Sequence, residues 1–406
     1  MLIYFKIANY KSIKDPIELN FNASSISEHT HSNVIEQEAM PLLKSIVMYG
    51  PNASGKSKIL DAFEFFRWFI INSAIETQRN ESINVEPFLL SKETIDKPSF
   101  FEASFIIGEI KYRYGFEASK DQVHKEWLLE SKATKEYPVF LRINEDFQIE
   151  KKRFPNADGL EKRTRKNALF LSVASQWNVK KAEQVNEWFA NIYSIHGLAD
   201  EAYKEHTIDL LKTDAFADLI NRFVQKVDLG IQNVEYAGIS LGEFKKDREE
   251  IDVFAVHNSF NAKGEIEGQV AFDLYEKESE GTKKYFNLIG VFISAILESR
   301  LVIMDEFDAR FHTLLSKSIL KLFNSSEIIS KSQLLVASHD TALLDRDLLR
   351  RDQIYFVEKN GFGATEITSL VEYKPRKESP YDKNYLDGKY GAIPFINDLA
   401  SLMSHG

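Results

Sequence analysis

The stretch Ser45–Ser57 reads SIVMYGPNASGKS, and the rest of the sequence is best understood from it outward. Its first five residues are a short apolar run typical of a buried strand, and Gly50–Ser57 fits the pattern G-x-x-x-x-G-K-[ST] without a mismatch. Apolar residues then recur at helical spacing from Ile59 to Phe69. A strand, a glycine-rich loop and a helix in this order predict a phosphate-binding loop. A chance glycine-rich turn before a helix is the alternative.

Each part of this loop has an expected role. Gly50 and Gly55 let the backbone turn so that successive N–H groups point inward, and the start of the next helix adds partial positive charge. Lys56 is expected to reach the outer phosphates of a nucleotide, and the Ser57 hydroxyl is expected to bind Mg²⁺. The residues predicted to bind the nucleotide are Asn52, Ala53, Ser54, Gly55, Lys56 and Ser57.

Composition limits the class of protein. The 406 residues are 44% hydrophobic, which is ample for one large domain with an insertion or for two packed lobes. The absence of cysteine excludes disulfides and thiolate chemistry and suits a reducing cytosol. Without an apolar run of membrane-spanning length or a secretory leader, we expect a cytoplasmic protein and no membrane partner. The net charge of −10 argues against a surface that embraces nucleic acid, although a local basic groove stays open.

A second chemical cluster closes the apolar run Leu301–Met304. The run ends in Asp305 and Glu306, as expected for a buried parallel strand with two carboxylates at its C-terminal end. Open α/β sheets bind ligands at that edge, so both acids are expected to face the loop at Gly50. Asp305 would hold Mg²⁺, and Glu306 would accept a proton from an attacking water. The alternative is a neutralised pair in the core.

Two further side chains are candidates for the same site. The apolar run Leu334–Ala337 leads to His339, which could form a hydrogen bond to a γ-phosphate; a satisfied core histidine is the alternative. Gln176 ends another apolar run and could orient Mg²⁺ or a water.

A second anion site is predicted far along the chain. Ser279 suits the N-cap of a helix that follows, and the exposed N–H groups after Gly281 can bind an anion. Two anion sites for one nucleotide suggest that the nucleotide lies between two subunits.

Periodicity sets the expected organisation. Residues alternate between apolar and polar from Ser99 to Glu130, as in an antiparallel meander, while Ala182–Asp228 shows helical spacing. We therefore expect an α/β fold with a mixed sheet, an antiparallel β flank and an inserted helical lobe. The predicted divisions are an N-terminal lobe over 1–180, a helical insertion over 181–230 and a C-terminal lobe over 231–406.

With these residues in hand, the chain resembles the ABC-type AAA ATPases of the SMC, Rad50 and RecF-like branch. Within that branch it is most similar to the stand-alone, RloA-like bacterial ATPases of abortive-infection and anti-phage systems. The matching segments are an opening hairpin at Asn9–Ile13, a Walker A loop at Gly50–Ser57, a Q-loop candidate at Gln176, a signature at Ser279–Thr282, a Walker B strand at Asp305–Glu306, a D-loop at Phe307–His312, a switch histidine at His339 and a tail at Tyr385–Pro394.

The resemblance implies slow ATP hydrolysis with ATP and Mg²⁺ held between the subunits of a homodimer or higher oligomer. Ser279 and Gly281 of one copy would close on the phosphate held by Lys56 of the other. It also implies a separate effector, a toxin or nuclease, as partner. The alternatives are a DNA-repair ATPase that acts on DNA itself and a chain that senses nucleotide without turnover. The basic runs Lys151–Arg153 and Lys162–Lys166 are either solvated loops or contacts to a phosphate backbone.

Overall fold

A six-stranded sheet lies at the centre of the fold, in the order β11-β15-β16-β5-β17-β18. The computed structural model describes residues 1–36, 40–76, 78, 81–132, 134–228, 230–239 and 250–393. The strands of this sheet are β5 (Ser45–Tyr49), β11 (Tyr193–His196), β15 (Leu301–Asp305), β16 (Gln333–Ala337), β17 (Ile354–Lys359) and β18 (Thr365–Ser369). The first five in the order are parallel, and β18 runs antiparallel to β17. The predicted mixed sheet is confirmed.

A second sheet of seven antiparallel strands forms the predicted β flank, in the order β10-β9-β8-β7-β6-β1-β2. Its strands are β1 (Leu2–Ala8), β2 (Ile17–Asn20), β6 (Ser99–Ile107), β7 (Ile110–Ala118), β8 (Val123–Ser131), β9 (Tyr137–Ile143) and β10 (Asp146–Ile149). Short elements at Thr30–Asn33 (α1), Val34–Ile35 (β3) and Leu42–Leu43 (β4) connect it to the central sheet. Neighbouring strands follow one another along the chain from β6 to β10, as in a meander.

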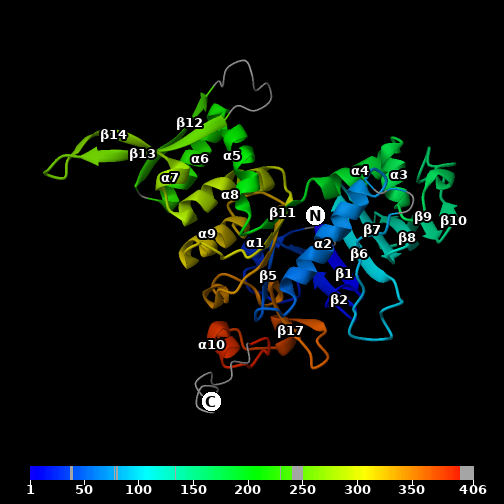
Figure 1. Ribbon diagram of the computed structural model, residues 1–406. Helices are drawn as coiled ribbons and strands as arrows, with labels where there is room; N and C mark the ends of the chain where they lie inside the picture. The colour runs from blue at the N-terminus through cyan, green and yellow to red at the C-terminus, as the bar shows by residue number, and fades with distance from the viewer. Residues whose placement is uncertain are drawn as a thin grey trace, which may run out of the picture.

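Helix α2 (Lys56–Asn72) shares one hydrophobic core with both sheets. Its phenylalanines occur at helical spacing and pack on rings from the antiparallel sheet; the rings of Phe66 and Phe116 lie 5.4 Å apart. Figure 1 shows α2 lying across the strands of the β flank. Since full burial of each phenylalanine contributes about 1.5–3 kcal/mol, this contact holds the start of α2 firmly in place.

The opposite face of the central sheet is covered by α8 (Glu280–Leu297) and α9 (Thr313–Phe323). Alternate residues of the parallel strands belong to opposite cores: Ile46 lies in the first, and Val47 in the second. Parallel strands that are covered on both faces need apolar residues at nearly every position, which explains the continuous apolar runs in the sequence.

A unit of helices and a small sheet follows β11. Its elements are α5 (Lys204–Leu211), α6 (Asp214–Val227), β12 (Ile231–Ile239), β13 (Glu250–Phe260), β14 (Ile266–Asp273) and α7 (Leu274–Lys277). Its helices α5 and α6 fall within the predicted insertion of 181–230, and its strands and α7 lie after residue 230. In Figure 1 the hairpin β13–β14 of this unit projects away from the rest of the chain. The helices α3 (Phe170–Gln176) and α4 (Lys180–Ala190) instead pack on α2, so 181–230 contributes to both cores. The division at 180 and 230 stays a prediction, and 240–249 and 394–406 lie outside the described residues.

The C-terminal segment packs against the central sheet. Helix α10 (Tyr381–Leu386) and the turn after it place the rings of Tyr385 and Tyr390 at 5.3 and 5.2 Å from that of Phe356 on β17. The Glu358 carboxylate on the same strand accepts a hydrogen bond of 2.7 Å from the Ala392 backbone N–H. The tail predicted from Tyr385 to Pro394 is therefore described up to Ile393, and Pro394 lies outside the described residues.

Candidate active site

The loop Gly50–Ser57 connects β5 to α2 and folds as a tight cradle. Ala53 and Gly55 both have left-handed backbone conformations, with φ of 63° and 115°. A Cβ atom on Gly55 would lie 2.1 Å from the Thr365 Oγ1, so only glycine fits there. Asn52 and Ala53 are exposed at the tip, whereas Ser54, Gly55 and Lys56 are buried beneath it. The loop can therefore offer its outer face to a ligand while its base stays packed.

Two distant segments brace this cradle. The Thr365 hydroxyl on β18 donates a hydrogen bond of 3.0 Å to the Ser54 carbonyl and lies 2.9 Å from the Ser12 hydroxyl. The Thr365 backbone N–H also donates to the Ser12 carbonyl at 2.7 Å. The hairpin at Asn9–Ile13 thus lies beside the loop. Its Lys11 forms an ion pair of 3.0 Å with Asp61 on α2.

Lys56 lies inside the cradle with only 5% of its surface exposed. Its Nζ donates hydrogen bonds to the carbonyls of Gly50 at 2.7 Å and Pro51 at 3.2 Å. Burial lowers the pKa of Lys56 to about 8, although the nearby carboxylates of Asp305 and Glu306 act in the opposite direction. A buried ammonium whose donors reach only carbonyls of its own loop is ready to turn toward an anionic ligand.

The C-terminal ends of three neighbouring parallel strands meet at this edge of the sheet. Asp305 ends β15, Ala337 ends β16 and Tyr49 ends β5, and the registers place Val336 beside both Met304 and Val47. The Asp305 and Glu306 charges both act on the pKa of Lys56, so the structure brings the two acids to the loop, as the sequence predicts. Glu306 has a left-handed backbone (φ 49°), and its N–H donates to the Asp305 Oδ1 at 3.0 Å.

His339 follows β16 at the same edge and is exposed. Its backbone N–H donates a hydrogen bond of 3.0 Å to the Asp308 Oδ1, and the preceding Ser338 N–H donates to the Met48 carbonyl at 3.0 Å. These bonds join the segment after β16 to β5 on one side and to the loop after β15 on the other. An exposed ring at this position does not fit the alternative of a satisfied core histidine.

Gln176 is the predicted site residue that the structure places elsewhere. It ends α3, whose Ser172 hydroxyl accepts a hydrogen bond of 3.1 Å from the Ala74 N–H, just beyond the C-terminal end of α2. Lys56 and Ser57 lie at the other end of this 17-residue helix. Since such a helix is about 25 Å long, Gln176 cannot reach a metal at Ser57. This corrects the expectation that Gln176 orients Mg²⁺ or water.

His196, which was not predicted as a site residue, lies at the same edge of the sheet. It ends β11, pairs in register with Asp305 and is exposed. The next residue, Gly197, donates to the Asp305 carbonyl at 2.9 Å, and a Cβ there would lie 2.3 Å from the Glu306 carbonyl. His196 is hard to predict from the sequence, because β11 has only four residues and shows no clear alternation.

The residues of the second predicted anion site lie at the start of α8. Ser279 is the N-cap, and its hydroxyl accepts a hydrogen bond of 3.2 Å from the Thr282 N–H. Ser279 and Glu280 are exposed, and Gly281 is half-buried. The Asp228 carboxylate at the end of α6 accepts a hydrogen bond of 3.1 Å from the Thr282 hydroxyl, which ties this helix tip to the insertion.

These donors suit a nucleotide with Mg²⁺. Within the described part of the chain, no group of three or more His, Asp or Glu side chains is arranged to hold a metal ion by itself. Mg²⁺ in proteins commonly takes one or two side-chain oxygens and completes its octahedron with phosphate oxygens and water. Ser57 and Asp305 can supply those protein oxygens, so the residues fit a metal that arrives with a nucleotide.

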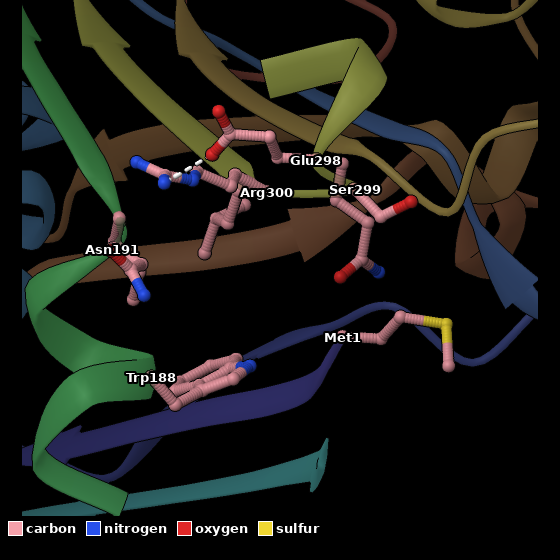
Figure 2. A pocket seen from close by; sticks show the side chains of 9 residues that line it. Met1, Trp188, Asn191, Glu298, Ser299 and Arg300 are labelled. Carbon is pink, nitrogen blue, oxygen red and sulfur yellow. Dashed lines mark ion pairs between the residues drawn. The ribbon is translucent and has the colours of Figure 1, made fainter. Parts of the chain in front are cut away.

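A cavity of about 280 Å³ lies at the opposite edge of the central sheet, where β15 and β16 begin. Met1, Trp188, Asn191, Ser299 and Arg300 are among the residues that line it, as Figure 2 shows. The Arg300 guanidinium forms an ion pair with Glu298 and a hydrogen bond of 3.2 Å to the Tyr193 hydroxyl. Its charge is therefore already balanced, and the cavity offers no cradle of backbone N–H groups like that at Gly50–Ser57.

Comparison with protein families identifies the class of this site. Residues 45–345, well over half of the chain, match the family described as "AAA domain, putative AbiEii toxin, Type IV TA system". The chain belongs to this AAA family. The matched region contains the loop at Gly50–Ser57, the helix tip at Ser279, the acids Asp305 and Glu306, and His339. The family match therefore supports the general function of an ATPase of this AAA class.

Solved structures with a similar arrangement include heads of SMC proteins. The SMC head domain from Thermotoga maritima is 15% identical, with 91% of this chain and 98% of that chain covered and a TM-score of 0.43. An SMC head from Pyrococcus furiosus, bound to the C-terminal domain of ScpA, is 13% identical, with 92% and 97% covered and a TM-score of 0.44. The ABC transporter component cbiO1 from Clostridium perfringens is 11% identical, with 94% of each chain covered and a TM-score of 0.33.

No curated protein sequence matches the chain. Among the described residues of this AAA protein, no helix combines the length and the apolar character needed to cross a bilayer.

Proposed function

We propose that this AAA protein is a regulatory ATPase of a bacterial anti-phage system, in which two copies clamp ATP and Mg²⁺ and thereby control a separate effector. The observation that carries the proposal is an asymmetry between two anion sites. The cradle with Lys56 lies next to Asp305 and Glu306 of the same chain, whereas Ser279 is exposed at a helix tip and its hydroxyl contacts Thr282 of the same helix. One chain can thus hold and cut a triphosphate but leaves its second clamp open.

Binding in this scheme begins at the cradle. The backbone N–H groups of Asn52–Gly55 surround the outer phosphates, and the Lys56 ammonium exchanges its bonds to Gly50 and Pro51 for bonds to phosphate oxygens. The Ser57 hydroxyl and the Asp305 carboxylate hold Mg²⁺, which neutralises charge on the phosphates when it is bound.

Hydrolysis then depends on the residue next to Asp305. Glu306 accepts a proton from the water whose oxygen attacks the γ-phosphorus, and the bond from that phosphorus to the bridging oxygen of ADP breaks, so that ADP and phosphate are formed. His339, on the neighbouring strand, donates a hydrogen bond to the γ-phosphate and loses that partner after hydrolysis. The hydrogen bond from the His339 N–H to Asp308 gives this change a path to the loop after β15.

A second copy completes the site. The Ser279 hydroxyl and the N–H groups near Gly281 of that copy close on the γ-phosphate, so ATP favours the dimer and hydrolysis releases it. The family description, which includes a toxin system, supports a defence role. The described residues from 341 to 393 complete the central sheet and its tail, and in this proposal the toxic activity belongs to a separate effector chain.

The DNA-repair alternative has less support. In the basic runs, Lys151 pairs with Asp158 at 2.9 Å and Arg153 pairs with Glu130 at 2.7 Å. Arg165 donates a hydrogen bond of 3.2 Å to the Ala74 carbonyl. Cations that already have partners, in a chain with a net charge of −10, make a weak surface for a phosphate backbone.

The substitution Glu306→Gln tests the proposal. It removes the proton acceptor and keeps the shape, so hydrolysis should fall by about 100- to 10,000-fold while ATP binding remains. ATP should then convert the variant from monomer to a stable dimer, measured by light scattering after gel filtration. Glu298→Gln, at the opposite sheet edge, is the matched control and should hydrolyse ATP like the unchanged protein.

Three outcomes would count against the proposal. If the unchanged protein does not bind ATP, or if Glu306→Gln stays monomeric with ATP, the clamp is wrong. If DNA raises turnover strongly and in a salt-sensitive manner, the DNA-repair alternative takes its place.

A further inference from the structure

Lys284 is a fully buried lysine one turn inside helix α8, and its surroundings are unusual. None of its surface is exposed. Its Nζ donates a hydrogen bond of 2.5 Å to the Ala309 carbonyl and lies 3.5 Å from the carbonyls of Glu306 and Phe307. The ammonium also lies 4.3 Å from the centre of the Phe311 ring. All four contacts belong to one segment, Glu306–Phe311, which we call the acid loop.

The acid loop needs such support, because its own backbone is strained. Glu306 and Arg310 both have left-handed conformations, with φ of 49° and 64°. Each such residue costs about 1–3 kcal/mol and persists only where the surroundings impose it. The backbone hydrogen bonds described within the loop close two short turns. The Ala309 N–H donates to the Glu306 carbonyl, and the Phe311 N–H donates to the Asp308 carbonyl, each at 3.1 Å.

The start of α8 touches the same loop. A Cβ on Gly281 would lie 3.0 Å from the Arg310 carbonyl, and the Arg310 guanidinium lies 3.8 Å from the Glu280 carboxylate. The helix tip that carries Ser279 and the loop that carries Glu306 are therefore packed together within one chain, with the Lys284 ammonium between the helix and the loop carbonyls.

We propose that Lys284 is a positioning residue that joins the Ser279 helix tip to the acid loop, so that the two move as one body and the two ATP sites of a dimer are coupled. This inference rests on the proposed function. In the clamp, Ser279 of one copy contacts the ATP held by the other copy, whereas Glu306 of that first copy acts on its own ATP. When Ser279 binds the ATP held by the partner, the start of α8 moves, and the contacts of Lys284 move the acid loop with it. Glu306 then takes its catalytic position at the ATP of its own copy.

The charge around Lys284 suits this role. Burial lowers its pKa to about 8, while Asp200, Asp308 and Glu306 raise it and Arg310 lowers it further. The Asp200 carboxylate is held by Arg310 at 3.4 Å and by the Asn287 amide at 2.8 Å. The ammonium is thus the donor that satisfies these loop carbonyls, and an apolar residue of equal length would leave them unpaired.

The decisive variant is Lys284→Met, which keeps the length of the side chain and removes its donors. We expect nucleotide affinity of the monomer to change by less than about twofold, because the cradle is untouched. We expect kcat to fall by about 100-fold, since a shift of about 1 Å at a catalytic group has effects of this size. The Hill coefficient for ATP hydrolysis, expected to exceed one in the unchanged protein, should fall to one.

Lys44→Met is the matched control. Lys44 is also buried, also has a lowered pKa and donates to one carbonyl, that of Ser325 at 2.6 Å, but it lies at the opposite sheet edge. It should lose thermal stability as Lys284→Met does, with kcat and Hill coefficient unchanged. If Lys284→Met fails to fold, Phe311→Leu, which removes only the ring beneath the ammonium, should lower kcat and cooperativity in the same direction by a smaller factor.

The outcomes separate this inference from the function on which it rests. Loss of ATP-driven dimerisation in the unchanged protein would end the proposed function. Two outcomes would overturn the coupling alone, provided that ATP still causes the unchanged protein to dimerise. The first is a Hill coefficient of one in the unchanged protein. The second is cooperativity that remains intact in both Lys284→Met and Phe311→Leu.

Discussion

The two proposed anion sites of this chain, at Gly55 and at Gly281, differ in how deeply the surrounding protein buries them. The first lies in a loop whose base is buried and braced by Ser12 and Thr365. The second lies at a helix tip where Ser279 is exposed and its hydroxyl contacts Thr282, three residues on. In the proposed function the first site is complete in one chain, whereas the second presents its donors outward.

This difference separates binding from assembly. A braced loop holds its donors in place before a ligand arrives, so it can give affinity to a single chain. A helix tip whose serine hydroxyl is exposed adds nothing to binding until another surface brings a phosphate to it. We therefore expect variants of the first site to change ATP affinity, and variants of the second site to change dimerisation and hydrolysis. Three experiments can test this distinction.

The largest effect is expected at the tip. In Ser279→Arg a long cationic side chain replaces the hydroxyl at the surface that a second copy must reach. ATP hydrolysis should fall by about 100- to 1,000-fold, the range for loss of one donor to a transition-state oxygen. ATP should no longer cause dimerisation in gel filtration, while the Kd of the monomer for ATP stays within about twofold. A loss of ATP binding by this variant would contradict the distinction between the two sites.

The second effect is a contrast between two identical substitutions. Gly55→Ala places a methyl group 2.1 Å from the Thr365 Oγ1 on a left-handed backbone, whereas the nearest atoms to a methyl group in Gly281→Ala are the Arg310 carbonyl oxygen at 3.0 Å and the Ser279 Oγ at 3.8 Å. Strain of about 1–3 kcal/mol at Gly55 corresponds to a rise in the Kd for ATP of up to about 100-fold. Calorimetric titration of the Gly281→Ala monomer should give an unchanged Kd. Equal losses in both variants would show that the cradle is not complete by itself.

The smallest effect is the pH dependence of ATP binding to the cradle. Burial lowers the pKa of Lys56 to about 8. The side chain is therefore a charged ammonium well below that pH, and it loses its charge as the pH rises through that value. Because the charged form binds phosphate, the affinity should be constant from pH 6.5 to 7.5 and should fall by up to about tenfold per unit above pH 8. Titrations in the monomeric Ser279→Arg background isolate this step. In the same series with Lys56→Met added, ATP binding should be weak and its Kd should not change with pH. A Kd that still rises above pH 8 in this variant would assign the pH dependence to another group.

Much of the fold could be predicted from the sequence because long patterns determine it. The alternation from Ser99 to Glu130 became β6, β7 and β8, and the apolar run before Asp305 became a parallel strand ending at the site. The loop at Gly50 was predictable because each of its residue types has a steric or electrostatic reason to be there.

Other parts of the site were beyond the sequence because distant contacts determine them. Gln176 looked like a site residue, yet Ser172 holds its helix at the far end of α2. His196 and Thr365 reach the site only through sheet pairing with β15 and β17, a long-range arrangement with no local signature. The burial of Lys284 could not be predicted from the sequence, because it depends on the strained turn of the acid loop.

The bracing of the cradle by Thr365 also bears on how the protein is made. Residues 12, 54 and 365 meet at one point, so strands from both ends of the chain must be in place before the loop takes its shape. These contacts join residues that lie 353 and 311 positions apart in the chain. A polypeptide whose synthesis stops between residues 57 and 365 would contain the whole glycine-rich loop and still lack the threonine that braces it.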